Sequence, residues 1–326
     1  MKKLLCSVLA VSVSIMAMAA GNQAAPQTGG SAAVEANYPS KQITMIVPDP
    51  PGGSSDLVSR LAFAKVEKIL GQTVVIVNKG SSGSQLGILD LVKSPPDGYT
   101  ISNMSDFDIA SSFAAGVDLG FTVDQLEFVC SLTQGTLALF LGPSFPGEPS
   151  VAGLVAYAKA NPGKVTFGHA TAGQATVLKS LEKEAGIKIT PVVFNGGNDS
   201  YTALIGGHID AAILGTRFYD QAKDRGCTAI AVTSHDPFAL LPNVPTLVAS
   251  GYNVVNMEVC RAFFMPAGTP KPIVDKMAAA MQEGTNNDEF KKAMEAQNEM
   301  YLFRNGADAL NAFKQKIEQL KPFMTN

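Results

Sequence analysis

The feature that most constrains this chain is a regular alternation of short apolar runs with longer segments of helical periodicity. From position 38 onward, the pattern predicts helices at 57–70 and 86–93 and strands at 43–47, 73–77 and 99–102. A strand–helix–strand order places neighbouring strands parallel and packs the helices on the faces of the sheet. The alternation therefore predicts an α/β fold.

The alternation begins again after position 150 with different residues. Helices are predicted at 151–160, 174–185 and 200–205, and strands at 165–168, 189–194, 211–214 and 228–233. The chain has 326 residues, which is enough for two domains of about 150 residues each. With 46% hydrophobic and 16% charged residues, the sequence predicts two well-packed α/β units rather than a disordered or coiled-coil chain.

Two further apolar runs, 137–141 and 259–265, lie at the borders of these units and end in Gly- and Pro-containing turns. We expect them to cross between two lobes, and we expect helices at 272–281 and 308–320 to return to the first lobe. The predicted lobes are then 38–138 together with 260–326, and 139–259. A cleft between two lobes is a common place for a ligand to bind.

The first residues are predicted to form a cleaved export signal. Lys2 and Lys3 precede an apolar stretch, and Ala17-Met-Ala19 has the small residues that a signal peptidase requires. We predict a signal peptide at 1–25 and a flexible leader at 26–37, which places the protein in the periplasm or another extracytoplasmic space. A retained anchor is the alternative, but the serine-interrupted stretch is marginal for spanning about 30 Å of hydrocarbon. The cysteine nearest this region, Cys6, lies inside the signal, so lipidation is not expected.

Charge and cysteine usage exclude several classes of protein. Lys and Arg total 25 against 28 Asp and Glu, and no basic run is long enough to follow a phosphate backbone, so no nucleic-acid partner is expected. Cys130, Cys227 and Cys260 have no zinc-like spacing, and we expect them to be buried apolar residues with at most one disulfide. The chain also lacks G-x-G-x-x-G and Gly-Lys-Ser/Thr motifs, so neither a cofactor nor a metal is predicted.

A Gly-rich segment follows the first predicted strand and opens the first predicted helix. Its backbone N–H groups are placed to face an anion along the helix dipole, which suits a carboxylate. A turn followed by a helix cap is an equally good interpretation of this segment alone. The candidate ligand-binding residues here are Pro51, Gly52, Gly53, Ser54, Ser55 and Asp56.

Two similar junctions occur in the second unit, and each has small residues that let a ligand approach the backbone. Turn formation alone remains an alternative for either of them. The candidates at the first of these junctions are His169, Ala170, Thr171, Ala172, Gly173 and Gln174. The candidates at the second are Asn195, Gly196, Gly197 and Asn198.

Histidine and arginine side chains provide the remaining candidates. His169, His208 and His235 occur without a G-x-S-x-G elbow, an H-E-x-x-H pair or a local nucleophile, so no catalytic residue is predicted. Arg217 and Arg261 follow or lie within predicted strands, where a guanidinium can bind a carboxylate bidentately. An ordinary ion pair is the default for both, and the ligand-binding interpretation is favoured more for Arg261.

Several short motifs in a fixed order are typical of one protein family. They are Tyr38-Pro-Ser-Lys-Gln-Ile-Thr44, Pro51-Gly-Gly-Ser-Ser-Asp56, Leu70-Gly-Gln-Thr-Val-Val75, Pro96-Asp-Gly-Tyr-Thr100, Ala158-Lys-Ala-Asn-Pro-Gly163, Gly206-Gly-His-Ile-Asp210, Leu241-Pro-Asn-Val-Pro-Thr246 and Pro266-Ala-Gly-Thr-Pro-Lys-Pro272. The chain resembles the extracytoplasmic solute receptors of the tripartite tricarboxylate transporter family, also called Bug receptors, from Tyr38 nearly to the C-terminus.

The resemblance implies a two-lobed periplasmic-binding-protein fold of the Venus-flytrap, type II-like kind, with the ligand cleft between the lobes. It also implies that a loop on each lobe, 51–56 and 168–176, grips one ligand carboxylate, with 194–199 closing the cleft. This sequence departs from the family at Cys260-Arg-Ala262, where many members have an aromatic residue before the arginine. It also has His169-Ala-Thr-Ala172 where a Ser/Gly-rich run is more usual.

These observations predict a binding protein, not an enzyme. The expected ligand is a small organic carboxylate, most simply a di- or tricarboxylate, and the expected partners are the large and small membrane subunits of a tripartite transporter, with the receptor itself monomeric. A ligand-sensing receptor for a membrane signalling partner is the alternative. An exported enzyme built on His169 or His208 with a nearby Asp is a third possibility.

Overall fold

The described structure begins where the apolar alternation of the sequence begins. The computed structural model describes residues 37–80 and 85–324. The predicted signal peptide, 1–25, and all of the predicted leader before Asn37 lie outside the described residues. Residues Tyr38–Asn326 group into one compact unit. Within the described segments, no helix is both long enough and apolar enough to cross a membrane.

The first strands form the predicted parallel group. Strand β1 (Ile43–Val47) pairs in parallel with β2 (Val74–Asn78) on one side and with β3 (Thr100–Ser105) on the other. Helices α2 (Ser54–Leu70) and α3 (Gln85–Val92) connect these strands. The apolar residues of β1 are buried because both faces of the sheet are covered by helices.

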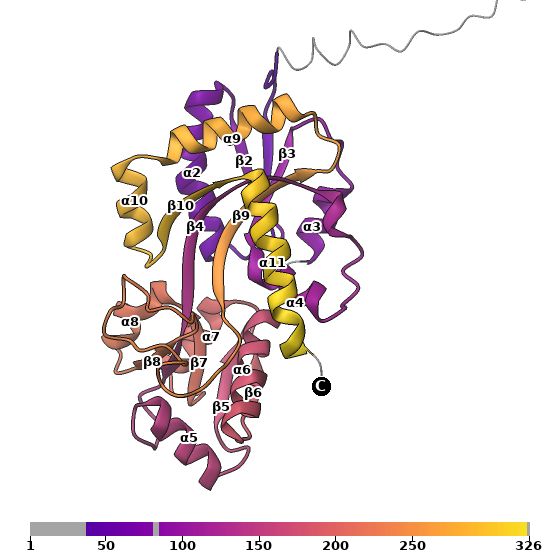
Figure 1. Cartoon of the computed structure of the whole chain (residues 1–326). Helices are drawn as coiled ribbons and strands as arrows, with labels where there is room; N and C mark the ends of the chain where they lie inside the picture. Colours follow the sequence, from indigo (N-terminus) through magenta and orange to yellow (C-terminus); the bar gives the residue numbers. More distant parts are fainter. Residues whose placement is uncertain (1–36, 81–84, 325–326) are drawn as a thin grey trace, which may run out of the picture. The chain divides into compact units, whose positions relative to one another are not determined.

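A long central strand, β4 (Leu126–Leu141), joins two parts of the sheet (Figure 1). Its first part pairs antiparallel with β9 (Glu258–Pro266) and β10 (Met300–Asn305), whereas residues 137–141 pair antiparallel with β7 (Ala211–Gly215). The sequence predicted only residues 137–141 as a strand, because polar residues interrupt the apolar run before them. The sheet is consequently mixed rather than parallel throughout, since β9 also pairs antiparallel with β3.

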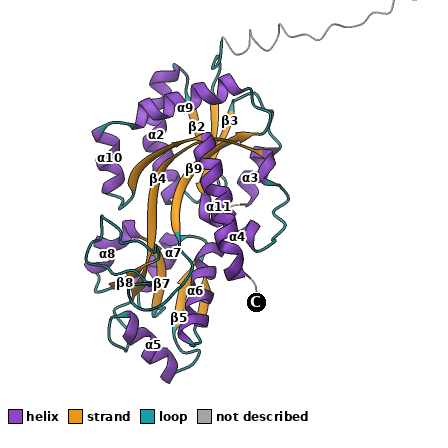
Figure 2. Cartoon of the chain, viewed as in Figure 1, coloured by secondary structure: helices purple, strands orange, loops and turns teal. Residues whose placement is uncertain are grey.

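The second group of strands is again built around a parallel core. Strand β5 (Thr166–His169) pairs in parallel with β6 (Thr190–Val193) and with β7, while β8 (Thr228–Val232) pairs antiparallel with the end of β4. The helices that connect this group are α5 (Val151–Ala160), α6 (Ala172–Ala185), α7 (Gly197–Ile205) and the short α8 (Tyr219–Lys223). Figure 2 shows these helices around the lower strands, while α2 and α9 (Lys271–Thr285) lie around the upper ones.

The C-terminal part of the chain packs against elements from its beginning. Helix α9 lies against α2, and α11 (Gly306–Met324) lies against α4 (Asp106–Ala114). Helix α10 (Asp288–Glu295) and β10, which the sequence patterns did not predict, complete this part. These contacts agree with the expected return of the C-terminal helices, and the exact lobe boundaries stay a prediction.

The buried cysteines fit the packing role expected of them. Cys130 is fully buried, and Cys227 and Cys260 are each 5% exposed. All three are free thiols. Burial, together with the nearby Asp106 carboxylate, raises the pKa of the Cys260 thiol to about 11. The side chain is therefore a neutral, unreactive group at neutral pH.

Candidate functional site

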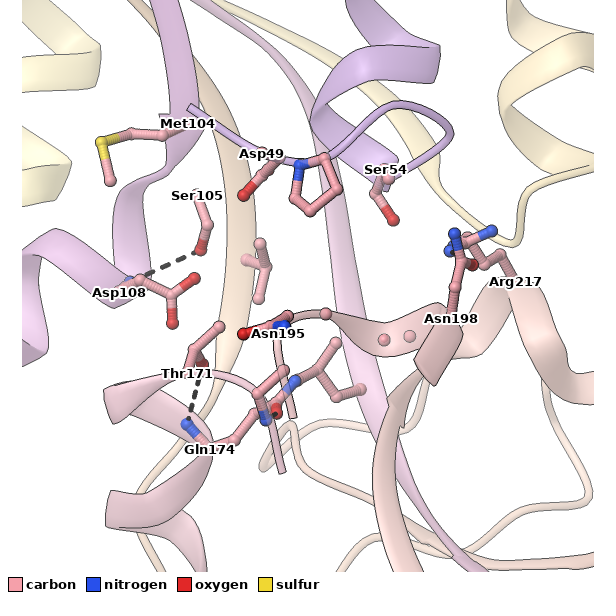
Figure 3. Close-up of a pocket in the computed structure, with 18 of the residues that line it drawn as sticks. Asp49, Ser54, Met104, Ser105, Asp108, Thr171, Gln174, Asn195, Asn198 and Arg217 are labelled. Atoms are coloured by element: carbon pink, nitrogen blue, oxygen red, sulfur yellow. Dashed lines mark hydrogen bonds between the residues drawn. The ribbon is translucent and has the colours of Figure 1, made fainter. Parts of the chain in front are cut away.

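A cavity of about 320 Å³ lies where the ends of several strands and helices meet. This volume is near the lower end of the roughly 300–1,000 Å³ that is typical of small-molecule sites. The N-termini of three helices, α2, α6 and α7, border the cavity, together with the β3–α4 junction, the end of β7 and part of β9. Figure 3 shows labelled side chains from the three helix N-termini and from the β3–α4 junction around a common space.

The N-termini of α2 and α7 are not capped by side chains. The N-cap residues of these helices are Gly53 and Gly196, and neither accepts a side-chain hydrogen bond because neither has a side chain. The first N–H groups of a helix have no partner within the helix, and the helix dipole places partial positive charge at the same end. Two helix ends bordering one cavity therefore form a good environment for a carboxylate.

Helix α6 is capped within the protein. The Oγ1 atom of Thr171 accepts a hydrogen bond from the Gln174 N–H at 3.2 Å. The Gln174 side chain in turn accepts from the Ala170 N–H at 2.6 Å through its Oε1 atom. These two bonds fix the loop before α6, so the positions of Ala170 and Thr171 are set before any ligand binds.

The loops before α2 and α7 approach each other across the rim of the cavity. A methyl group placed on Gly196 would lie 3.8 Å from Pro50 Cγ, and one placed on Gly52 would lie 3.8 Å from Asn198 Nδ2. These are ordinary van der Waals distances, so the space alone would accept a Cβ atom at either position. The left-handed conformation of Gly52, with a φ of 76°, is what favours glycine at that position.

Acidic and hydroxyl groups lie on one side of the cavity. Asp49, Ser105 and Asp108 are close together in Figure 3, and the Ser105 Oγ atom accepts from the Asp108 N–H at 3.4 Å. Burial raises the pKa of the Asp108 carboxyl, and the nearby Asp49 raises it further, although hydrogen bonds from Thr171 and Ser105 act in the opposite direction. The Oδ1 atom of Asp108 is buried and has no hydrogen-bond partner among the described residues.

Arg217 lies on the opposite side of the cavity, where its Nη2 atom donates to the Asn198 side chain at 2.7 Å (Figure 3). Its guanidinium also stacks on the Phe218 ring, 4.0 Å from the ring centroid. Burial lowers the pKa of Arg217, and the positive charge of Arg261 lowers it further. Arg217 stays protonated at neutral pH because an arginine pKa starts above 12.

Arg261 is a buried member of an ion pair at the back of the cavity. Its Nη2 atom lies 2.9 Å from Glu299 Oε1, and the two side chains are 10% and 9% exposed. Thr133 donates to the other Glu299 oxygen at 2.6 Å. Burial opposes charge on Arg261, but the attraction and hydrogen bonds of Glu299 raise its pKa. The ion pair that the sequence offered as the default for Arg261 is therefore present, and Arg261 also lines the cavity.

Most of the predicted ligand-binding residues line this one cavity, although they come from four separate segments. They are Pro51, Gly53, Ser54, Ala170, Thr171, Ala172, Gln174, Asn195, Gly196, Gly197, Asn198 and Arg261. Five others, Gly52, Ser55, Asp56, His169 and Gly173, do not line it.

Four of these five residues, Ser55, Asp56, His169 and Gly173, are buried in the protein. Asp56 accepts hydrogen bonds from the Gly52 N–H, the Asn78 amide and the Arg60 guanidinium, and Ser55 is fully buried beside it. His169 is 8% exposed, and burial lowers the pKa of its imidazole.

Several lining residues were not among the sequence candidates. They are Asp49, Pro50, Met104, Ser105, Asp108, Ser112, Leu137, Asp199, Gly215, Phe218, Met257 and Val259, together with Arg217, which was considered but not favoured. Asp49 and Pro50 adjoin a predicted segment, so extending that segment would have included them. Ser105 and Asp108 sit at a strand-to-helix junction like the predicted ones, but this junction lacks glycine. The other residues occur in strands or turns without a local signal.

The described residues do not contain a cluster of three or more His, Cys, Asp or Glu side chains suited to a metal. Glycine amides, three amide side chains, hydroxyls, carboxylates and guanidinium groups line the cavity. These are groups that bind and orient a small polar molecule through hydrogen bonds and charge.

Comparison with known proteins gives one consistent family. Residues 58–324 match the family described as tripartite tricarboxylate transporter family receptor, TctC. A UPF0065 protein of Agrobacterium vitis is 33% identical over 250 residues, covering 76% of this chain and 72% of that protein. Protein BugT of Bordetella pertussis is 30% identical over 268 residues, covering 80% of this chain and 81% of BugT.

Solved structures agree with these relatives. The periplasmic binding protein BugD matches with a TM-score of 0.80 and 26% identity, covering 87% of this chain and 97% of BugD. MatC of Rhodopseudomonas palustris with bound malate matches with a TM-score of 0.82 and 22% identity, covering 88% of this chain and all of MatC. The predicted two-lobed periplasmic-binding-protein fold is therefore confirmed.

Proposed function

This chain belongs to the receptors of the tripartite tricarboxylate transporter family, and on that premise we propose that it captures a small organic carboxylate without performing chemistry on it. The observation that supports the carboxylate is the pair of uncapped helix N-termini, α2 and α7, at one cavity. A carboxylate held there accepts hydrogen bonds from backbone N–H groups and lies at the positive ends of both helix dipoles.

The sequence resemblance favours a di- or tricarboxylate, and the malate bound by MatC is a dicarboxylate. In the proposed complex, backbone amides near Gly53 and Gly197 grip one carboxylate. The side chains of Thr171, Asn195 and Asn198 provide neutral hydrogen-bonding groups around the rest of the ligand.

Ligand binding is proposed to favour a closed form of the protein. Loops that are far apart in sequence line the cavity. A ligand that contacts all of these loops binds best when the loops are close together. A ligand shifts such an equilibrium by its difference in affinity for the two forms. We propose that the large and small membrane subunits of the transporter recognise the closed form and that residues 1–25 are removed on export to the periplasm.

A thermal-shift measurement tests the binding function. Purified protein is heated with a panel of mono-, di- and tricarboxylates, and with neutral sugars as a control. A ligand present at about 100 times its dissociation constant stabilises the folded form by about 2.7 kcal/mol, which raises the unfolding midpoint measurably. Stabilisation by sugars and by no carboxylate would contradict the proposal.

Uptake by whole cells tests the proposed partner. Deleting the gene is expected to abolish uptake of the labelled carboxylate that gives the largest thermal shift, and a plasmid copy is expected to restore it. Unchanged uptake together with altered gene expression in the presence of the carboxylate would instead favour the sensing alternative.

A further inference from the structure

A loop of three prolines and one aspartate connects β1 to the segment that opens α2. This proline loop consists of residues 48–51, and its Asp49, Pro50 and Pro51 line the cavity, with Asp49 labelled in Figure 3. A proline fixes its own φ at about −65° and restricts the residue before it. Every residue of the proline loop is a proline or precedes one, so the loop moves as one stiff piece.

The position of the proline loop affects two helix N-termini at the cavity. The Gly53 N–H donates to the Pro50 carbonyl at 3.1 Å, and Gly53 is the N-cap residue of α2. Pro50 also faces the loop before α7, where a methyl group on Gly196 would lie 3.8 Å from Pro50 Cγ. A displacement of the proline loop therefore reaches the N-termini of both α2 and α7.

Gly80, which lies two residues after the end of β2, packs against the proline loop without lining the cavity. A Cβ atom on Gly80 would lie 2.8 Å from Pro50 N and 3.0 Å from the Asp49 carbonyl carbon. Both are backbone atoms, so neither can rotate away as the end of a flexible side chain can. The φ of Gly80 lies outside the left-handed region, so the close approach alone requires glycine here.

Gly87, a buried residue of α3, makes a second such contact and also does not line the cavity. A Cβ atom on Gly87 would lie 2.7 Å from Pro48 Cβ and 3.0 Å from Pro48 Cα. Alanine forms a helix better than glycine does, so the local conformation favours alanine at this position. The contact with Pro48 is therefore the reason that glycine fits here.

Hydrogen bonds hold the same part of the chain close to the proline loop. The Asn78 Nδ2 atom donates to the Asp49 carbonyl at 3.0 Å, and the Lys79 N–H donates to the Val47 carbonyl at 2.8 Å. Non-bonded carbon atoms need a separation of about 3.5–4.0 Å. A methyl group at either glycine must therefore displace the proline loop by roughly 0.5–1 Å.

Resting on the proposed function, we propose that Gly80 and Gly87 are positioning residues of the binding site. Their lack of a side chain lets the proline loop lie where the N–H groups of α2 meet the ligand carboxylate. A hydrogen bond of about 2.9 Å is lost when its atoms are moved to about 3.6 Å, so a displacement of this size is enough to weaken binding. The loss concerns a carboxylate that different ligands share, so it is expected to be similar for carboxylates of different size.

Calorimetric titration of the purified protein with propionate, succinate, L-malate and citrate tests the proposal. Gly80→Ala and Gly87→Ala are each expected to bind every probe that the unmodified protein binds about tenfold or more weakly. Urea unfolding of the same samples measures stability separately. A positioning role predicts that affinity falls in both variants even where the unfolding midpoint stays close to that of the unmodified protein.

Gly153→Ala is the matched control, because Gly153 also lies in a helix and packs against the loop before it. A Cβ atom on Gly153 would lie 2.2 Å from the Glu148 carbonyl oxygen, and neither residue lines the cavity. The control is expected to lower the unfolding midpoint at least as much as the two test variants. Its affinity for the probes is expected to stay within about twofold of that of the unmodified protein.

The outcomes separate this inference from the function on which it rests. Unchanged affinity in a folded variant would overturn the positioning role of that glycine and leave the carboxylate receptor intact. Gly87→Ala decides the question if Gly80→Ala does not fold, because its contact is with Pro48 and is independent of the first.

An affinity loss as large in Gly153→Ala would also overturn the proposal, since the loss would then follow from general destabilisation. A loss for some probes and not for others would overturn the assignment of the effect to a shared carboxylate. Failure of the unmodified protein to bind any of the four probes would overturn the proposed function, and the positioning role with it.

Discussion

At the scale of single residues, Asp56 has a structural role that its place in a family motif does not reveal. Its two carboxylate oxygens accept hydrogen bonds from the Gly52 N–H at 2.9 Å, from Arg60 Nε at 2.9 Å and from the Asn78 amide at 3.0 Å. These bonds tie the start of α2 to the preceding loop and to β2. Asp56 therefore shapes the binding loop from behind instead of contacting the cavity.

Asp56→Asn is expected to lower the free energy of unfolding by about 1–3 kcal/mol at pH 7, because buried donors lose a charged acceptor. Burial opposes its ionisation, but hydrogen bonds from Arg60, Gly52 and Asn78 lower the pKa of Asp56 below its ordinary value of 3.8. A lowered folded-state pKa gives stability that is present above the unfolded pKa and is lost as the pH falls through the folded one.

Urea unfolding at pH 7 and at pH 3 measures both effects. The difference between Asp56→Asn and the unmodified protein is expected to shrink below about pH 4. Asp308→Asn, in the exposed first turn of α11, is the control and is expected to cost less than about 0.5 kcal/mol. An equal loss in both variants would contradict the assigned role.

Gly173 is a second residue whose role in the structure differs from the ligand contact that the sequence predicted for it. The sequence suggested that a side chain there would obstruct the ligand, but Gly173 does not line the cavity. A Cβ atom on Gly173 would lie 2.7 Å from Phe107 Cδ1 and 2.7 Å from Asp108 Oδ1. The glycine allows α6 and α4 to approach closely.

Gly173→Val is therefore expected to force α6 away from α4 and to weaken ligand binding by at least about tenfold, since close contact of the two helices is lost. Lys179→Val places the same β-branched residue at an exposed position of α6 and is the matched control. Calorimetry with the panel carboxylate that binds tightest measures the effect. Equal affinities of the two variants would exclude the close approach of α6 and α4 as a requirement for binding.

At the scale of secondary-structure elements, the buried pair Arg261–Glu299 joins β9 to the turn before β10. Glu299 also accepts from Thr133 on β4, so three segments meet at one carboxylate. Asn298, in the same turn, has a φ of 51° and exchanges hydrogen bonds with Thr216 beside Arg217. The positions of both arginines therefore depend on this one turn.

Glu299→Gln is expected to destabilise the protein by about 3–5 kcal/mol, because it leaves a buried guanidinium without a charged partner. Asp275→Asn breaks an exposed ion pair, in which Lys271 and Asp275 are 83% and 59% exposed, and is expected to cost less than about 1 kcal/mol. Urea unfolding compares the two variants. A cost for Glu299→Gln as small as that of the control would show that the buried pair does not hold this turn.

At the scale of the whole molecule, the binding residues come from segments that only folding brings together. Hydrogen exchange is expected to slow on ligand binding at 49–54, 170–174 and 195–198, because these loops are held in place by the ligand. The central part of β4 is expected to exchange slowly with or without ligand. Uniform protection over the whole chain would argue against loop closure and for general stabilisation.

The sequence by itself determined the order and type of most elements. The bounds of β1 and α5 agree with the predicted 43–47 and 151–160, because local periodicity and turn residues decide where such elements begin and end. The same local signals located the Gly-rich junctions that border the cavity. The ordered motifs identified the family for the same reason, since each motif is a local feature of one turn or helix end.

Only the tertiary structure decided which side chains face the cavity. Asp56 and Gly173 belong to predicted segments but are buried and do not line the cavity. Asp108 and Arg217 line the cavity, although they come from segments without a distinguishing local pattern. The direction in which a side chain points at a junction depends on the packing of elements that are distant in sequence. The two examples here are the packing of α4 against α6 and of β9 against the turn that precedes β10. The charge of the cavity follows from those contacts, so no local pattern in the chain encodes it.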